Sequence, residues 1–102
     1  MGSSLDLQVI LEQIPGVEHV YFQPPESVRM EYPAIIYGHA DYDKLSANNK
    51  AYKIDRRYSV TLVYNDIEME EAVNALLALP YCSYDRHYVA DQLHHDVFTL
   101  YY

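Results

Sequence analysis

The chain has 102 residues, a formal net charge of -8 and twelve tyrosines, but no tryptophan and only one cysteine. The scarcity of lysine and arginine argues against nucleic-acid binding, because affinity for phosphates comes from clustered basic side chains. One cysteine excludes an internal disulfide bond and indicates a reducing compartment, and no apolar run approaches the roughly 18 residues of a membrane-spanning helix. The length predicts a single domain over residues 1–102.

Two helices are predicted from apolar side chains at helical spacing. The first can be capped by Ser3 or Ser4 and ends at Pro15. The second starts with Asp66 as its N-cap, carries glutamates in its first turn and stops at Pro80. The predicted buried stripes consist of Leu7, Ile10, Leu11 and Ile14 in the first helix, and of Met69, Val73, Leu76 and Leu77 in the second.

Five strands are predicted, over residues 17–23, 33–40, 51–65, 83–90 and 95–102. The third is the longest, with mostly apolar side chains at its even-numbered positions and polar ones at most of its odd-numbered positions. At about 3.3 Å per residue it would span about 50 Å, more than the roughly 26 Å diameter of a domain of this size. Part of it therefore either projects as an arm or is not strand. The polar segment before it, residues 41–50, predicts a long exposed loop that is mobile in a free protomer.

The predicted order of elements is αβββαββ, without an internal repeat. Two helices on one face of a mainly antiparallel sheet make an α+β sandwich. Glycine occurs at residues 2, 16 and 38 only, so the sequence has no glycine-rich loop that could cradle a phosphate. The excess of tyrosine suits protein interfaces and equally suits half-buried strands.

The side chains that could bind a metal gather near the C-terminus: Cys82, Asp85, His87, His94, His95 and Asp96. Zinc sites usually show short paired spacings such as C-x2-C or H-x3-H, and this stretch has neither. His94 and His95 are adjacent, so in a strand they point to opposite faces, although His87 could meet one of them across a hairpin. We therefore expect no metal and no cofactor.

The same stretch holds the parts of a nucleophilic site, with Cys82 as nucleophile, His87 or His95 as base and an aspartate to orient the base. The cysteine directly follows the expected end of the second helix, in a domain too small for a deep cleft. A lone cysteine in such a chain is more often a small buried hydrophobe. We expect no catalytic residue here, but a charged strand that discourages wrong pairing and suits a specific neighbour.

Three segments carry a resemblance to a known family: VYFQPPESVRMEYPAIIY (20–37), RRYSVTLVYND (56–66) and LPYCSYDRHYVADQLHHDVFTLYY (79–102). They resemble small tail proteins of long-tailed double-stranded DNA phages, of the tail terminator or tail completion group. The resemblance implies a lambda-type terminator fold and a ring, usually a hexamer, that caps the tail tube and faces the neck. The implied partners are other copies of the chain, the tail tube protein and a neck protein, with DNA passing through unbound. The implied location is the virion tail, after assembly in the host cytoplasm.

An additional C-terminal strand departs from the terminator pattern, which makes a neck or head-tail connector ring protein of related fold the first alternative. A small metal-binding or hydrolase module using Cys82, His87 and His95 is a second, and a monomeric adaptor is a third. We expect residues 82–96 to form a contact between subunits. We also expect Arg56 and Arg57, in the predicted third strand, to pair with acidic side chains of their own chain or of a neighbouring subunit. The predicted interface residues are Tyr42, Lys44, Arg56, Arg57, Asp85, Arg86, His87, His94 and His95.

Overall fold

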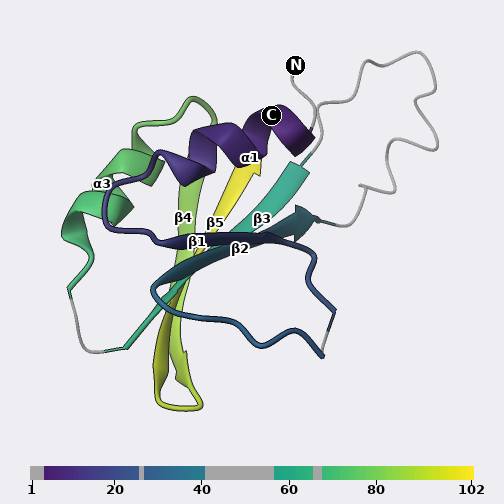
Figure 1. Cartoon of the computed structure of the whole chain (residues 1–102). Coiled ribbons are helices and arrows are strands. Elements are labelled where there is room, and N and C mark those ends of the chain that lie inside the picture. The colour runs from purple at the N-terminus through teal and green to yellow at the C-terminus, as the bar shows by residue number, and fades with distance from the viewer. Residues whose placement is uncertain (1–3, 26, 41–56, 66–67) are drawn as a thin grey trace.

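The computed structural model of the protein describes residues 4–25, 27–40, 57–65 and 68–102. Within these residues it contains two helices and a five-stranded mixed sheet, which confirms the predicted α+β class (Figure 1). The predicted loop 41–50, the first part of the predicted long strand, and with them Tyr42, Lys44 and Arg56, lie outside the described residues. The elements are α1 (Ser4–Glu12), β1 (His19–Phe22), β2 (Ala34–His39), β3 (Arg57–Tyr64), α3 (Glu70–Leu77), β4 (Cys82–Ala90) and β5 (Leu93–Tyr101).

The sheet has the strand order β1-β2-β3-β5-β4. β1 runs parallel to β2, and the other three neighbouring pairs are antiparallel. The C-terminal strand β5 therefore lies inside the sheet, between β3 and β4 (Figure 1). β4 is left at the margin of the sheet, and an edge strand presents a row of backbone N–H and C=O groups to whatever lies beside it.

The two helices cover one face of the sheet (Figure 1). Along β3 the side chains of Tyr58, Val60 and Leu62 are fully buried beneath them. This alternation is the one predicted from the sequence, and it follows from the two-residue period of a strand. The other buried members of the same cluster are Leu7, Leu11, Ile14, Ile35, Tyr37, Met69, Ala72, Leu76, Phe98 and Leu100.

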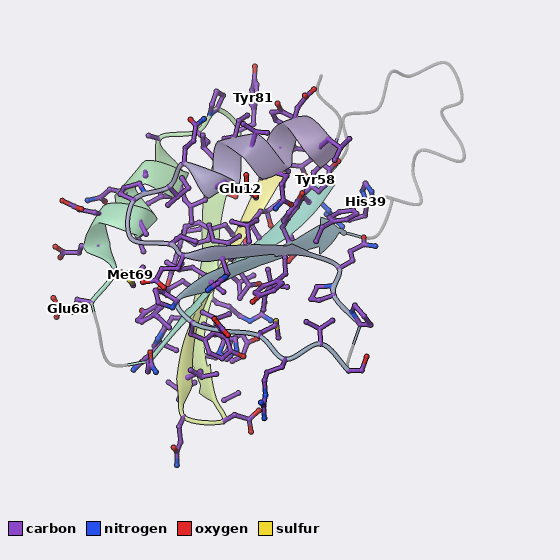
Figure 2. All side chains as sticks on the ribbon, viewed as in Figure 1. Glu12, His39, Tyr58, Glu68, Met69 and Tyr81 are labelled. Atoms are coloured by element: carbon purple, nitrogen blue, oxygen red, sulfur yellow. The ribbon has the colours of Figure 1, made fainter. Side chains whose placement is uncertain are left out.

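The start of α3 differs from the sequence prediction. The helix begins at Glu70, and its N-cap residue is Met69, whose side chain makes no cap hydrogen bond. The predicted N-cap, Asp66, lies outside the described residues and is not the N-cap of this helix. Met69 occupies that position and is buried in the core just before the first turn (Figure 2). The buried stripe is also rotated by one position, so Ala72 is buried whereas Leu77 is 43% exposed.

β4 and β5 form a hairpin whose tip extends beyond the helices (Figure 1). Asp91 and Gln92 form its two-residue turn, with φ values of 53° and 65°, and Ala90 lies opposite Leu93. Two successive residues with positive φ are the mark of a type I′ turn, whose twist matches that of the flanking strands. The predicted start of the last strand at residue 95 is therefore two residues late, because this turn lacks the glycine that would have marked it.

Tyr58 is fully buried, yet its hydroxyl has no hydrogen-bond partner within the described part of the chain. A buried hydroxyl without a partner costs about 1–3 kcal/mol of desolvation. We therefore expect Tyr58→Phe to raise the free energy of unfolding by about 1 kcal/mol in urea denaturation. Tyr37→Phe is the control and should lower it, because the Tyr37 hydroxyl donates a hydrogen bond to Gln8 Oε1 at 2.8 Å. A loss of stability in Tyr58→Phe would show that its hydroxyl is bonded after all.

Candidate interface on the C-terminal hairpin

The β4–β5 hairpin carries the stretch that the sequence singled out for chemistry. Residues 83–90 of β4 are all exposed. A β-bulge between Tyr84 and Arg86 makes Asp85 an extra residue in the strand. Tyr84, before the bulge, lies opposite Phe98, and His87, after it, lies opposite Asp96. Phe98 and Asp96 point to the face of the sheet that the helices cover. Because a bulge shifts the two-residue period of a strand, Tyr84 and His87 point to that same face. The bulge thus gathers polar side chains of both parts of β4 on one face.

Asp96 lies at the centre of this face, with only 5% of its surface exposed. Its carboxylate accepts hydrogen bonds from the hydroxyls of Tyr64, at 2.9 Å, and Tyr84, at 2.8 Å. Burial, followed by the hydrogen bond to Asp96 and the charge of that carboxylate, raises the pKa of Tyr64 to about 12. The same causes, in the same order, raise the pKa of Tyr84. Both hydroxyls therefore remain donors at neutral pH, and the buried carboxylate keeps both partners.

Two histidines stack on this network. The ring centroid of His94 lies 5.2 Å from that of Tyr64 and 5.3 Å from that of His87. His87 Nε2 lies 3.2 Å from His94 Nδ1, so one of the two nitrogens carries the proton and the other accepts it. The histidine that meets His87 across the hairpin is therefore His94. The pair lines a surface pocket of about 410 Å³ together with Tyr64, Asn65, Glu68, Met69, Glu70 and Val73.

The opposite face of the hairpin holds a second stack. Tyr88 lies across from His95, and their rings are parallel within 8° at a centroid distance of 4.5 Å. The guanidinium carbon of Arg86 lies 5.4 Å from the centroid of the Tyr88 ring. His95 Nδ1 lies 3.1 Å from the Leu93 carbonyl oxygen and donates to it. The prediction that His94 and His95 face opposite sides of the sheet is confirmed.

Two further predicted interface residues have other surroundings. Asp85 lies on the same side as Tyr88 and accepts a hydrogen bond from Thr99 Oγ1 at 2.6 Å. Arg57 begins β3 opposite Tyr101, at the end of the sheet away from the hairpin turn. The structure therefore places Arg57 apart from His87, His94 and His95.

The three residues of the rival hydrolase reading do not converge. Cys82 lies opposite Leu100, whereas His87 lies opposite Asp96, four residues earlier on β5. His95 is on the other face, against Tyr88. No shared nucleophilic site can form from Cys82, His87 and His95 in this arrangement.

Burial, with a smaller contribution from the charge of Asp85, raises the pKa of Cys82 to about 11. The reactive form of a cysteine is its thiolate, and this pKa keeps the folded thiol protonated at neutral pH. We expect a chromogenic disulfide reagent to react with the native protein far more slowly than with the urea-unfolded chain. The native rate should keep rising with pH up to about 11. Equal rates in both states at neutral pH would contradict this prediction.

Among the described residues, no group of three or more histidine, cysteine, aspartate or glutamate side chains is placed to hold a metal ion. No helix in the described part of the chain is long and apolar enough to cross a membrane. Comparison of the chain with family models, with curated proteins and with solved structures gives no match.

Proposed function

We propose that the protein is a structural virion component, a ring that caps the phage tail tube and joins it to the neck. The observation that carries the proposal is the β4 edge, residues 83–90, which are all exposed although they belong to the sheet of a small domain. Tyr88 and Val89 on this edge are 40% and 57% exposed. An exposed edge strand presents unpaired backbone groups and is a template for pairing with another chain, which supports association between copies.

Two features of the β4 edge support a specific contact over indiscriminate pairing. The bulge at Asp85 and the charge of Arg86 are devices that limit which strand can pair with an edge. A contact of this kind that joins different surfaces of two copies closes into a ring when repeated by rotation. The net charge of -8 supports a pore through which DNA passes without binding. The resemblance of segments 20–37 and 79–102 to tail terminators is the reason for placing the ring at the end of the tail tube.

A neck connector ring is the second candidate. It is favoured by the C-terminal strand that departs from the terminator pattern. β5 pairs with both β3 and β4, so this strand is an integral part of the sheet and no appendage. Both candidates require a ring, and they differ in the partner that the ring binds.

The test combines sedimentation at several concentrations with electron micrographs of the protein alone and mixed with tail tubes. We expect rings that seat on tube ends. Rings that bind isolated heads or necks and ignore tubes would favour the connector. If the protein is a monomer at every concentration and does not bind tube ends, both candidates are contradicted and the hypothesis of a monomeric adaptor is favoured.

A further inference from the structure

On the helix-side face of the hairpin, two imidazole nitrogens lie about as far apart as two nitrogen ligands of one metal ion. His87 Nε2 and His94 Nδ1 are 3.2 Å apart. Zinc binds histidine nitrogen at about 2.0–2.1 Å in a tetrahedral arrangement, which sets two nitrogens on one ion about 3.3–3.4 Å apart. The two nitrogens therefore already stand near the spacing of two ligands of the same ion. In the present contact one nitrogen donates its proton to the other, so binding of a shared ion requires that proton to shift to the other nitrogen of its ring and both lone pairs to turn toward a common point.

The rings are also held in place by their neighbours. His94 stacks on Tyr64, and the Tyr64 hydroxyl is fixed by its hydrogen bond to buried Asp96. His87 stacks on the other side of His94, in a position that it reaches because of the bulge at Asp85. Ligands that are oriented before binding lose less conformational freedom when the ion arrives.

The electrostatic setting favours a cation. Glu68 and Glu70 line the same pocket, and none of the described residues that line it is lysine or arginine. Figure 2 shows Glu68 extending from the chain just before α3. The chain as a whole carries a net charge of -8, so a divalent ion is attracted to this region.

We propose that His87 and His94 form a two-imidazole site for a late first-row divalent metal ion such as Zn²⁺. Imidazole suits zinc, copper and nickel, and water completes the coordination, because among the described residues no third histidine, cysteine or carboxylate side chain is placed to join the pair. The sequence favoured no metal because paired zinc-type spacings are absent and His94 and His95 point to opposite faces, although His87 could meet one of them across a hairpin. The structure shows that this one is His94.

The chain supplies a matched control for this site. His95 neighbours His94 in sequence and is also half-exposed, but it points to the opposite face, where it stacks on Tyr88. Zn²⁺ alone is titrated by calorimetry into the untagged wild-type protein and into His87→Gln, His94→Gln and His95→Gln, with circular dichroism to check each fold. The measurement does not depend on whether the protein assembles into rings, because zinc is counted per chain.

We expect one zinc per chain in the wild type and in His95→Gln. Loss of an outer-shell partner typically weakens metal binding by about 10–100-fold, so loss of a ligand in His87→Gln or His94→Gln should weaken it at least as much. Binding should also weaken at acidic pH, because protons compete with the metal ion for imidazole nitrogens. A wild type that binds no zinc overturns the proposal, and so does a folded His87→Gln or His94→Gln variant with wild-type affinity.

Discussion

Val89→Asp should leave the protein folded and prevent it from forming rings. Val89 is 57% exposed at the β4 edge, so in the isolated chain the substitution should cost at most about 0.5 kcal/mol. In the proposed ring a neighbour covers this position, and burying a carboxylate without a partner is strongly unfavourable. The penalty recurs at every contact around the ring. Sedimentation should show monomers at concentrations where the wild type assembles, and circular dichroism should show an unchanged fold.

Two variants separate loss of contact from general charge repulsion. Val89→Lys introduces a positive charge, opposite in sign to the net charge of the chain. It should also block assembly if a neighbour covers this side chain. It should leave assembly intact if charge repulsion between chains is the only effect of Val89→Asp. Leu5→Asp adds the same charge as Val89→Asp on α1, where Leu5 is 77% exposed, and should assemble normally. Wild-type rings from Val89→Asp would exclude the β4 edge as the contact. The search would then move to other exposed tyrosines, such as Tyr81 and Tyr101.

The fold class could be predicted because it rests on patterns within single elements. The alternation that buries Tyr58 and Leu62 is a property of one strand, and the spacing of Leu7 and Leu11 is a property of one helix. The start of α3 could not be predicted in the same way. Asp66 is the better N-cap by local chemistry, but burial of Met69 decides where the helix begins.

The candidate site could be predicted only as far as one strand determines it. The opposite orientations of His94 and His95 follow from strand geometry alone. The meeting of His87 with His94 depends on the bulge at Asp85 and on the register of the hairpin, and no single element contains that information. The contact of Tyr64 with the hairpin depends in addition on the insertion of β5 beside β3. The tyrosine excess was the only signal in the sequence for such a residue.

Asp96→Ala should lower the free energy of unfolding by about 2–3 kcal/mol. The variant loses two hydrogen bonds to a charged group, each worth about 1.5–3 kcal/mol. The loss is smaller than the sum, because one of the two tyrosine hydroxyls can bond to water instead. That tyrosine is Tyr84, which is 44% exposed, whereas Tyr64 is more enclosed. Urea denaturation measures the loss. Asp85→Ala is the control: its carboxylate also accepts one side-chain hydrogen bond, from Thr99, but at an exposed position, so it should cost about 0.5 kcal/mol or less.

The alkaline titration of the same variant tests the cause of the loss. In the wild type the folded state holds the Tyr64 proton up to a pKa of about 12, whereas an unfolded tyrosine releases it near a pKa of about 10. The contribution of Tyr64 to stability is therefore fully present below about pH 10 and is lost as the pH rises through about 12. In Asp96→Ala the pKa of Tyr64 should fall toward its ordinary value, as read from tyrosinate absorbance, and the alkaline loss of stability should shrink. An unchanged titration in a variant that has lost stability would mean that Asp96 acts by filling space and not through its hydrogen bond to Tyr64.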